Sequence, residues 1–164
     1  MNKTIVIYGS STGTCEAIAE KIASKLGCEA INVQDLSADT ISDNQNLILG
    51  TSTWGAGELQ DDWYDGLKTL QGADLNGKTI AIFGCGDCST YSDTFVGGMG
   101  ELYNGIKDSG AKFIGRVATD GYTFDDSEAV IDGEFIGLAL DDINEDDKTD
   151  TRIEAWVAQI TPDL

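Results

Sequence analysis

The chain has 164 residues, 41% of them hydrophobic, and this length suits one domain over residues 1–164 with a single core. Ten basic residues against 29 acidic ones give a formal net charge of −19, which opposes binding to nucleic acid or to an anionic membrane. The sequence has no histidine, the commonest general base, and neither a membrane-length apolar run nor a secretory leader, so we expect a cytoplasmic protein in which acid–base catalysis is disfavoured.

The first expected element is a strand at residues 5–9, and a helix follows in which apolar residues recur at helical spacing from Ala17 to Leu26. The loop between them reads Ser10-Ser11-Thr12-Gly13-Thr14-Cys15. Backbone N–H groups and hydroxyls at the start of a helix can hold a phosphate, but this loop lacks the lysine of a P-loop and the glycines of a dinucleotide fingerprint. The pattern therefore predicts either a neutral site for one terminal phosphate monoester or an ordinary strand–helix turn with polar filler.

Strands and helices alternate along the rest of the chain. Further strands are expected at 29–33, 46–51, 78–86 and 112–118, and helices within 34–46, from about Gln60, through 95–106 and at the end of the chain. Thr151 and Glu154 have the spacing of a capping box, which places the start of the last helix near Thr151. Trp63 and Trp156 fall in apolar helical stripes and are expected in the core. The alternation predicts a parallel sheet with helices on both faces.

Residues 119–147 interrupt this alternation. A second strand-like run at 135–140 lies between acidic segments, so we interpret the segment as an insertion that splits the last strand. Residues 120–154 contain thirteen acidic and two basic residues. This acidic stretch is either a solvated face or a docking surface.

Three polar loops follow the first, third and fourth strands. The carboxyl ends of these strands border the switch point of a doubly wound sheet, where ligands bind. The first loop offers phosphate donors, the second carries Trp54 and the third carries Tyr91. Both aromatics lie among small and polar residues rather than in an apolar stripe, so they are expected to hold a planar heterocycle between them.

These loops resemble those of the long-chain flavodoxins. Ser10–Cys15 fill the phosphate loop of that family, although Cys15 replaces its usual final threonine and removes one hydroxyl donor. The other matching stretches are Thr53-Trp54, Gly57-Glu58-Leu59-Gln60 with Trp63, Gly86-Asp87 with Tyr91 and Phe95, Thr119-Asp120-Gly121-Tyr122, and Gly137-Leu138-Ala139-Leu140-Asp141. The resemblance covers essentially the whole chain.

The resemblance implies a three-layer α-β-α fold with a doubly wound sheet of five parallel strands in the order 2-1-3-4-5, the last one split by the insertion. It also implies noncovalently bound FMN and the role of a low-potential one-electron carrier, similar to a ferredoxin, rather than an enzyme. Trp54 and Tyr91 would flank the isoalloxazine. The FMN-binding residues that it implies are Ser10, Ser11, Thr12, Gly13, Thr14, Cys15, Thr53, Trp54, Gly55, Ala56, Gly57, Cys85, Gly86, Asp87 and Tyr91.

The expected partners are redox enzymes with a basic surface, of the reductase, pyruvate oxidoreductase or hydrogenase type, and the carrier is expected to be a monomer. Two other classes of protein are alternatives. An FMN enzyme such as a quinone reductase, or an activase for a metalloenzyme, would need an accessible pocket beside the flavin. A phosphoacceptor signalling domain would need carboxylates after the first and third strands, where Gly9-Ser10 and Gly50-Thr51 stand.

Cys85 and Cys88 form a Cys-x-x-Cys, a spacing used elsewhere for thiol redox chemistry or zinc. The pair follows a central strand, and neither a second cysteine pair nor a histidine completes a metal site. We therefore expect reduced thiols without a redox role here, and a half-buried structural role for Cys28.

Overall fold

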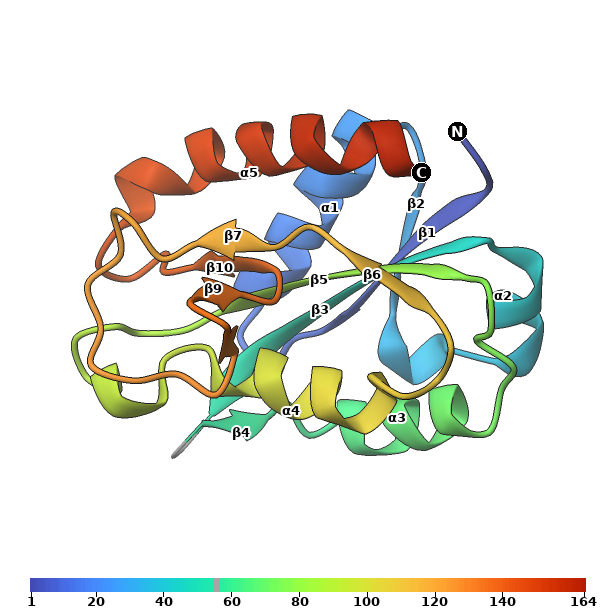
Figure 1. Ribbon diagram of the computed structural model, residues 1–164, viewed down its shortest axis with the longest axis horizontal. Helices are drawn as coiled ribbons and strands as arrows, with labels where there is room; N and C mark the ends of the chain where they lie inside the picture. Colours follow the sequence, from blue (N-terminus) through green and yellow to red (C-terminus); the bar gives the residue numbers. More distant parts are fainter. Residues whose placement is uncertain (55–56) are drawn as a thin grey trace.

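The computed structural model describes residues 1–54 and 57–164. A parallel sheet lies between two layers of helices (Figure 1). Its strands are β1 (Thr4–Gly9), β2 (Glu29–Asn32), β3 (Asn46–Trp54), β5 (Thr79–Cys85), β6 (Lys112–Ile114) and β10 (Leu138–Leu140). The helices are α1 (Thr14–Leu26), α2 (Ala38–Asp43), α3 (Trp63–Gln71), α4 (Gly97–Ile106) and α5 (Asp146–Ile160). The predicted three-layer α/β class is confirmed.

The order of the sheet is β2-β1-β3-β5, and both β6 and β10 pair with the outer edge of β5. β6 pairs with the first half of β5, where Lys112 lies opposite Thr79. β10 pairs with the second half, where Leu138 lies opposite Phe83. All of these pairings are parallel, so the fifth position holds one strand in two pieces. This confirms the predicted order 2-1-3-4-5 and the split.

The inserted segment forms its own antiparallel sheet. Its strands, in the order β7-β9-β8, are β7 (Val117–Ala118), β8 (Val130–Ile131) and β9 (Glu134–Phe135). The prediction of one strand over 112–118 is wrong, because β6 ends at Ile114 and Gly115 turns the chain with φ 87°. The ring of Phe135 lies 4.8–6.0 Å from the ring centroids of Phe95, Tyr122 and Phe124 and anchors the insertion.

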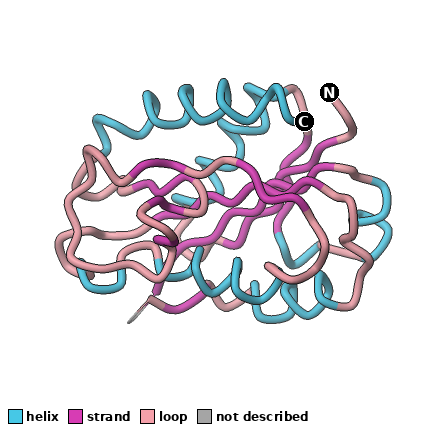
Figure 2. The backbone as a smooth tube through the Cα atoms, in the orientation of Figure 1, coloured by secondary structure: helices cyan, strands magenta, loops and turns pink. Residues whose placement is uncertain are grey.

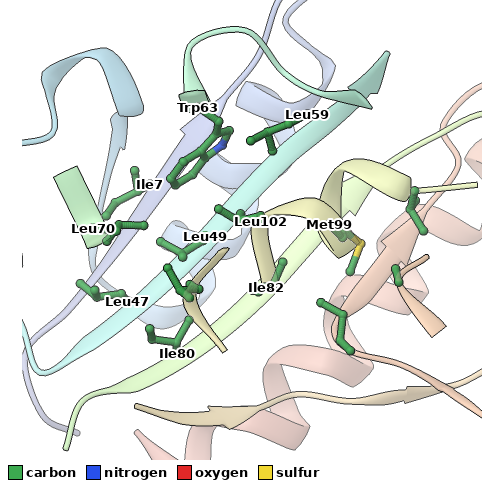
Figure 3. Packing of buried hydrophobic residues seen from close by; sticks show 14 of the residues in the cluster. Ile7, Leu47, Leu49, Leu59, Trp63, Leu70, Ile80, Ile82, Met99 and Leu102 are labelled. Carbon is green, nitrogen blue, oxygen red and sulfur yellow. The ribbon is translucent and has the colours of Figure 1, made fainter. Parts of the chain in front are cut away.

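Alternating side chains of the central strands pack on opposite faces of the sheet. Ile7 and Leu49 belong to the cluster under α3 and α4, which Figure 3 shows around Trp63 and Met99. Val6 and Ile48 belong to the cluster under α1 and α5. Strands buried on both faces read as continuous apolar runs, which is why the sequence locates them well.

Both predicted core tryptophans are buried, and both donate a hydrogen bond. Trp63 Nε1 donates to the carbonyl of Gly50 at 2.7 Å, and Trp156 Nε1 donates to the carbonyl of Gly115 at 2.8 Å. Each indole therefore satisfies its one polar group inside the core.

Three helix starts differ from the sequence predictions. α5 begins at Asp146, so Thr151 lies inside the helix and the predicted capping box is wrong. The first turn instead carries Asp146 and Asp147, whose charges suit the positive end of the helix dipole. α3 begins at Trp63 rather than near Gln60, and Phe95 precedes α4 rather than lying in it.

Short pieces complete the chain. β4 (Glu58–Leu59) pairs antiparallel with the end of β3, which extends β3 beyond the predicted 46–51. Single turns of 3-10 helix lie at Val33–Asp35, Ser92–Thr94 and Thr161–Asp163. Figure 2 shows long loops gathered at the end of the sheet where β3 and β5 finish. Within the described part of the chain, no helix is both long and apolar enough to cross a membrane.

Candidate functional site

The loop after β1 leaves the start of α1 open. Gly13 is the N-cap with φ 91°, and within the described chain no side chain accepts a hydrogen bond from the first turn. Ser10 Oγ accepts the N–H of Gly13 at 3.1 Å and closes the loop. Thr12 and Thr14 line a neighbouring cavity. A neutral nest of N–H groups and hydroxyls at the positive end of a helix is suited to a phosphate.

Gln60, which lies just before α3, holds this loop in place through a side-chain hydrogen bond. Its side chain is 1% exposed, and its Nε2 donates to Ser11 Oγ at 3.1 Å and to Asp62 Oδ2 at 2.9 Å. A Cβ at Gly9 would lie 2.5 Å from Gln60 Oε1 and from the Trp63 ring, so only glycine allows this approach. The first and second loops are thereby held together.

Trp54 ends β3 and is 41% exposed at the cavity, with its Nε1 donating to Ser52 Oγ at 2.9 Å. Thr53 Oγ1 accepts the N–H of Gly98 at 3.2 Å, which fixes the end of β3 to α4. Gly57, with φ 87°, packs against the Gly97 backbone rather than lining the cavity. Gly55 and Ala56, predicted here from the sequence, lie outside the described residues.

Tyr91 belongs to the loop after β5, is 47% exposed and lines the same cavity. Asp87 organises this loop: its Oδ1 accepts the N–H of Ser89 at 3.0 Å and of Thr90 at 2.9 Å, and its carbonyl accepts the N–H of Tyr91 at 3.0 Å. The hydrogen bond from Thr90 above all, against the opposing effect of burial, lowers the pKa of Asp87. Asp87 is therefore a fixed negative charge at the cavity.

A fourth loop, after β10, also borders the cavity and was missing from the predicted site. Asp142 and Ile143 line the cavity, and Ile143 is 72% exposed. Asp141, 1% exposed, anchors the loop because its Oδ1 accepts the N–H groups of Ile143 and Asn144 at 3.0 and 2.9 Å. The sequence contained a signal for this loop. The second piece of a split strand that pairs in parallel with β5 ends at the same edge of the sheet, so the loop after it reaches the site.

The cavity between the four loops has a volume of about 240 Å³. Eight predicted residues line it, namely Thr12, Thr14, Thr53, Trp54, Cys85, Gly86, Asp87 and Tyr91. Ser10, Ser11, Gly13, Cys15 and Gly57 do not line it, although the first three belong to the loop beside it. Residues that the sequence prediction missed are Ser52, Thr94, Phe95, Val96, Asp142 and Ile143.

Val96 marks a strained wall of the cavity. It is buried and has φ 46°, a left-handed conformation that is rare for a β-branched residue. A Cβ at Gly86 would lie 3.0 Å from the Val96 nitrogen, so Gly86 lets the loop after β5 pass close to the start of α4.

The cysteines have different surroundings, and all four are free. Cys15 is buried in the cluster under α1. Its pKa is raised, mainly by a hydrogen bond with Cys85 and next by burial. Its side chain therefore lies away from the phosphate loop. The pKa of Cys88 is raised to about 12, mainly by burial and next by a hydrogen bond with Asp141. Cys28 is half-buried, as expected.

The thiol of Cys88 lies near two carboxylates. Its Sγ is within 4.8 Å of a carboxylate oxygen of Asp141 and of one of Glu145. Both carboxylates already have partners. Glu145 accepts from Lys148 at 2.8 Å and from Arg152 at 3.1 Å, and Asp141 accepts backbone N–H groups. We interpret this cluster as an ion-paired anchor of the loop rather than a metal centre.

The chain is similar to known proteins over nearly its whole length. The family model for Flavodoxin matches residues 6–156. Flavodoxin 1 of Azotobacter vinelandii is 44% identical over 96% of this chain and 95% of its own, and the flavodoxin of a Nostoc species is 43% identical over 98% and 96%. A crystal structure of Fusobacterium nucleatum flavodoxin bound to flavin mononucleotide superposes with a TM-score of 0.93, at 31% identity over 100% of this chain and 99% of that one. The chain belongs to the flavodoxin family.

Proposed function

We propose that the 164 residues form one FMN-binding domain that carries low-potential electrons one at a time between redox enzymes, without being an enzyme itself. The observation that carries this proposal is the pair of exposed aromatics, Trp54 and Tyr91, on one cavity that also reaches the open start of α1. The donor set fits FMN, since one end of the cavity suits a phosphate and the other a planar ring. FMN supplies the electron-transfer chemistry, and the protein supplies binding and electrostatics.

The phosphate would be held by Thr12, Thr14 and the first-turn N–H groups of α1, and the remaining loop residues Ser10, Ser11, Gly13 and Cys15 give that loop its path. These donors are neutral. A dianionic phosphate is then balanced by the helix dipole and by hydrogen bonds, each worth about 1.5–3 kcal/mol to a charged group.

Trp54 and Tyr91 would take the two faces of the isoalloxazine. Thr53, Cys85, Gly86 and Asp87 line the cavity and, together with Gly55 and Ala56 from the sequence, would surround the rest of the ring and the chain that links it to the phosphate. Gly57 would support the loop beside them through its packing against Gly97. Stacking on an aromatic adds about 0.5–1.5 kcal/mol to area burial, so both rings also contribute to affinity.

The charge of the cavity lining favours a low potential. Its charged residues are Asp87 and Asp142, and no lysine or arginine occurs among the described lining residues. A carboxylate about 10 Å from an added negative charge opposes it by about 0.8 kcal/mol at an effective dielectric constant of about 40. The acidic lining therefore resists further reduction of the cofactor.

The partners that we propose are redox enzymes with a basic surface, of the reductase, pyruvate oxidoreductase or hydrogenase type. Support comes from the net charge of −19, which steers a basic partner towards a small acidic domain. We further propose that the carrier is a monomer that works in the cytoplasm, where its four free cysteines stay reduced.

The test is a titration of the apoprotein with FMN and with riboflavin, followed by flavin fluorescence. FMN is expected to bind at least about a hundredfold more tightly, because only FMN brings a phosphate to the loop. Thr14→Val should reduce this preference, and Thr69→Val, which changes a half-buried threonine on α3, serves as the matched control. Equal affinities for both ligands would show that the phosphate site is misassigned, and no binding of either would refute the proposed cofactor.

A further inference from the structure

Asn144 bridges two of the loops that line the cavity. Its Nδ2 donates to Asp87 Oδ1 at 2.7 Å, in the loop after β5, and to Asp141 Oδ2 at 2.8 Å, in the loop after β10. Both hydrogen bonds use one amide nitrogen, and its two hydrogens match the two acceptors. Both acceptors are carboxylates, so the bonds are of the stronger, charge-assisted kind.

Each of these carboxylates organises its own loop. Asp87 receives the N–H groups of Ser89 and Thr90 and so shapes the segment that carries Tyr91. Asp141 Oδ2 also accepts the N–H of Cys88 at 2.9 Å, across the gap between the loops. The loops are therefore joined by the hydrogen bond from the Asn144 amide to Asp87 and by hydrogen bonds between Cys88 and Asp141, which involve both the backbone and the thiol of Cys88.

Asn144 is not itself a lining residue of the cavity, but its neighbours are. Asp142 and Ile143 precede it and line the cavity, and Asp87 and Tyr91 in the neighbouring loop line it as well. Because Asn144 is bonded to a carboxylate in each loop, it fixes how the lining residues of the two loops lie relative to one another.

We infer that Asn144 is a positioning residue for the flavin: by tying the Tyr91 loop to the loop after β10, it holds the lining residues of both loops in the arrangement that the cofactor ring requires. This inference rests on the proposed function. It predicts that the identity of residue 144 changes the affinity for FMN without contact between its side chain and the ring.

The amide is chemically specific for this task. Aspartate has the same shape but, when ionised, offers no donor and adds a third negative charge beside Asp87 and Asp141. Asn144→Asp should therefore push the two loops apart, whereas Asn144→Ala should only release them. Both variants change a residue that is exposed, so neither removes core packing.

The experiment compares the FMN dissociation constants of the parent protein, Asn144→Asp, Asn144→Ala and the control Asn104→Asp. Asn104 is exposed on α4, so this control makes the same change of charge away from the bridge. Asn144→Asp should raise the dissociation constant at least tenfold, Asn144→Ala less, and Asn104→Asp less than twofold. Equal values for Asn144→Asp and Asn104→Asp would overturn the inference.

Hydrogen exchange of the holoprotein supplies a readout independent of electron transfer. The amides of Cys88, Ser89 and Thr90 should exchange faster in Asn144→Asp than in Asn104→Asp, because their acceptors lie in the bridged loops. Unchanged exchange of these three amides would show that the loops do not depend on Asn144.

A pH series separates the charge from the shape. An aspartate at 144 would sit between two carboxylates, which raise its pKa, and its protonated form regains one donor. The ratio of dissociation constants between Asn144→Asp and Asn104→Asp should therefore shrink as the pH falls from 7 to 5, while the ratio for Asn144→Ala stays constant. The charged or titratable groups around the position are Asp87 and Cys88 in the loop after β5, Asp141 and Asp142 after β10, and Glu145, Lys148 and Arg152 at α5.

The outcomes distinguish the two proposals. If the parent protein does not bind FMN, the proposed function fails. If the parent binds FMN and the ratio for Asn144→Asp does not change with pH, the bridge does not act through its donors and the inference fails.

Discussion

Replacing Gly13 with alanine tests whether the conformation of the phosphate loop is tied to cofactor binding. Gly13 has φ 91° and an added Cβ would meet nothing within 4 Å, so the substitution causes no clash and its whole effect is conformational. A left-handed conformation costs an L-residue about 1–2 kcal/mol. That free energy corresponds to a factor of about 5–30 in an equilibrium constant.

The cost should appear in the affinity for FMN. Ser11, Thr12 and Gly13 are exposed, and the described hydrogen bonds that hold their part of the loop are few, from Gly13 to Ser10 and from Gln60 to Ser11. In the apoprotein of Gly13→Ala the loop can relax to a negative φ, and FMN must then restore the strained form. The dissociation constant for FMN should rise about 5–30-fold, and that for riboflavin should stay the same.

Gly27→Ala is the matched control at the other end of the same helix. Gly27 also has a positive φ, 70°, and an added Cβ there also meets nothing within 4 Å. Gly27→Ala should lose about 1–2 kcal/mol of stability in urea denaturation, which is the cost of the left-handed conformation, and should keep its affinity for FMN. If fluorescence titration gives the two variants the same dissociation constant for FMN, the strained loop plays no part in phosphate binding and the reasoning is refuted.

Three further predictions concern the thiols, the anchor of the fourth loop and the acidic surface. Cys85→Ser, Cys88→Ser should retain FMN and electron transfer, because the two thiols have different partners and the flavin carries the electron; a variant that keeps FMN but no longer transfers electrons would show that a thiol takes part. Hydrogen bonds from Cys88 and Asn144 lower the pKa of Asp141 despite its burial, so the stability that its charge contributes is present above about pH 4 and is lost as the pH falls through the lowered pKa. The stability gap between the parent and Asp141→Asn, measured by urea denaturation, should therefore close below about pH 4, and a gap independent of pH would contradict this. Electron transfer to a basic reductase should slow as added salt shortens the Debye length from about 30 Å at 0.01 M to about 8 Å at 0.15 M, and rates that stay flat in stopped flow would mean that the acidic surface does not steer docking.

The central strands could be predicted from the sequence because both of their faces are buried. β3 and β5 read as apolar runs. β5 is one residue shorter at each end than the predicted 78–86, and pairing with β4 extends β3 beyond the predicted 46–51. The local sequence pattern predicted the wrong strand where pairing with a residue far along the chain decides the structure. Val117 and Ala118 continue the apolar pattern of β6 but pair with β9, because the turn at Gly115 moves them out of the main sheet.

The start of α5 shows a second limit. Residues 146–150 contain three aspartates, a lysine and a threonine, so they lack the apolar periodicity that marks a helix. Their acidic side chains are favourable at a helix N-terminus for electrostatic reasons, which a search for apolar spacing does not detect. The capping-box spacing at Thr151 was a coincidence of sequence.

The candidate site could be located from topology alone, through the loops after three of the strands. The loop after β10 was missed because the insertion hides where the last strand resumes. Cys15 was expected in the phosphate loop, and the structure places its side chain in the core, since the first turn of α1 already points one face towards the sheet. The roles of Gly55 and Ala56 stay predictions from the sequence.

The central claim is that this protein carries electrons by means of FMN. The most direct measurement is the reduction of cytochrome c by an NADPH-dependent flavodoxin reductase, with this protein added as apoprotein or loaded with FMN. We expect that only the FMN-loaded protein accelerates cytochrome c reduction, in proportion to its concentration. If the FMN-loaded protein is reduced by the reductase but passes no electrons to cytochrome c, or if the apoprotein accelerates the reaction equally, this protein does not carry electrons by means of FMN.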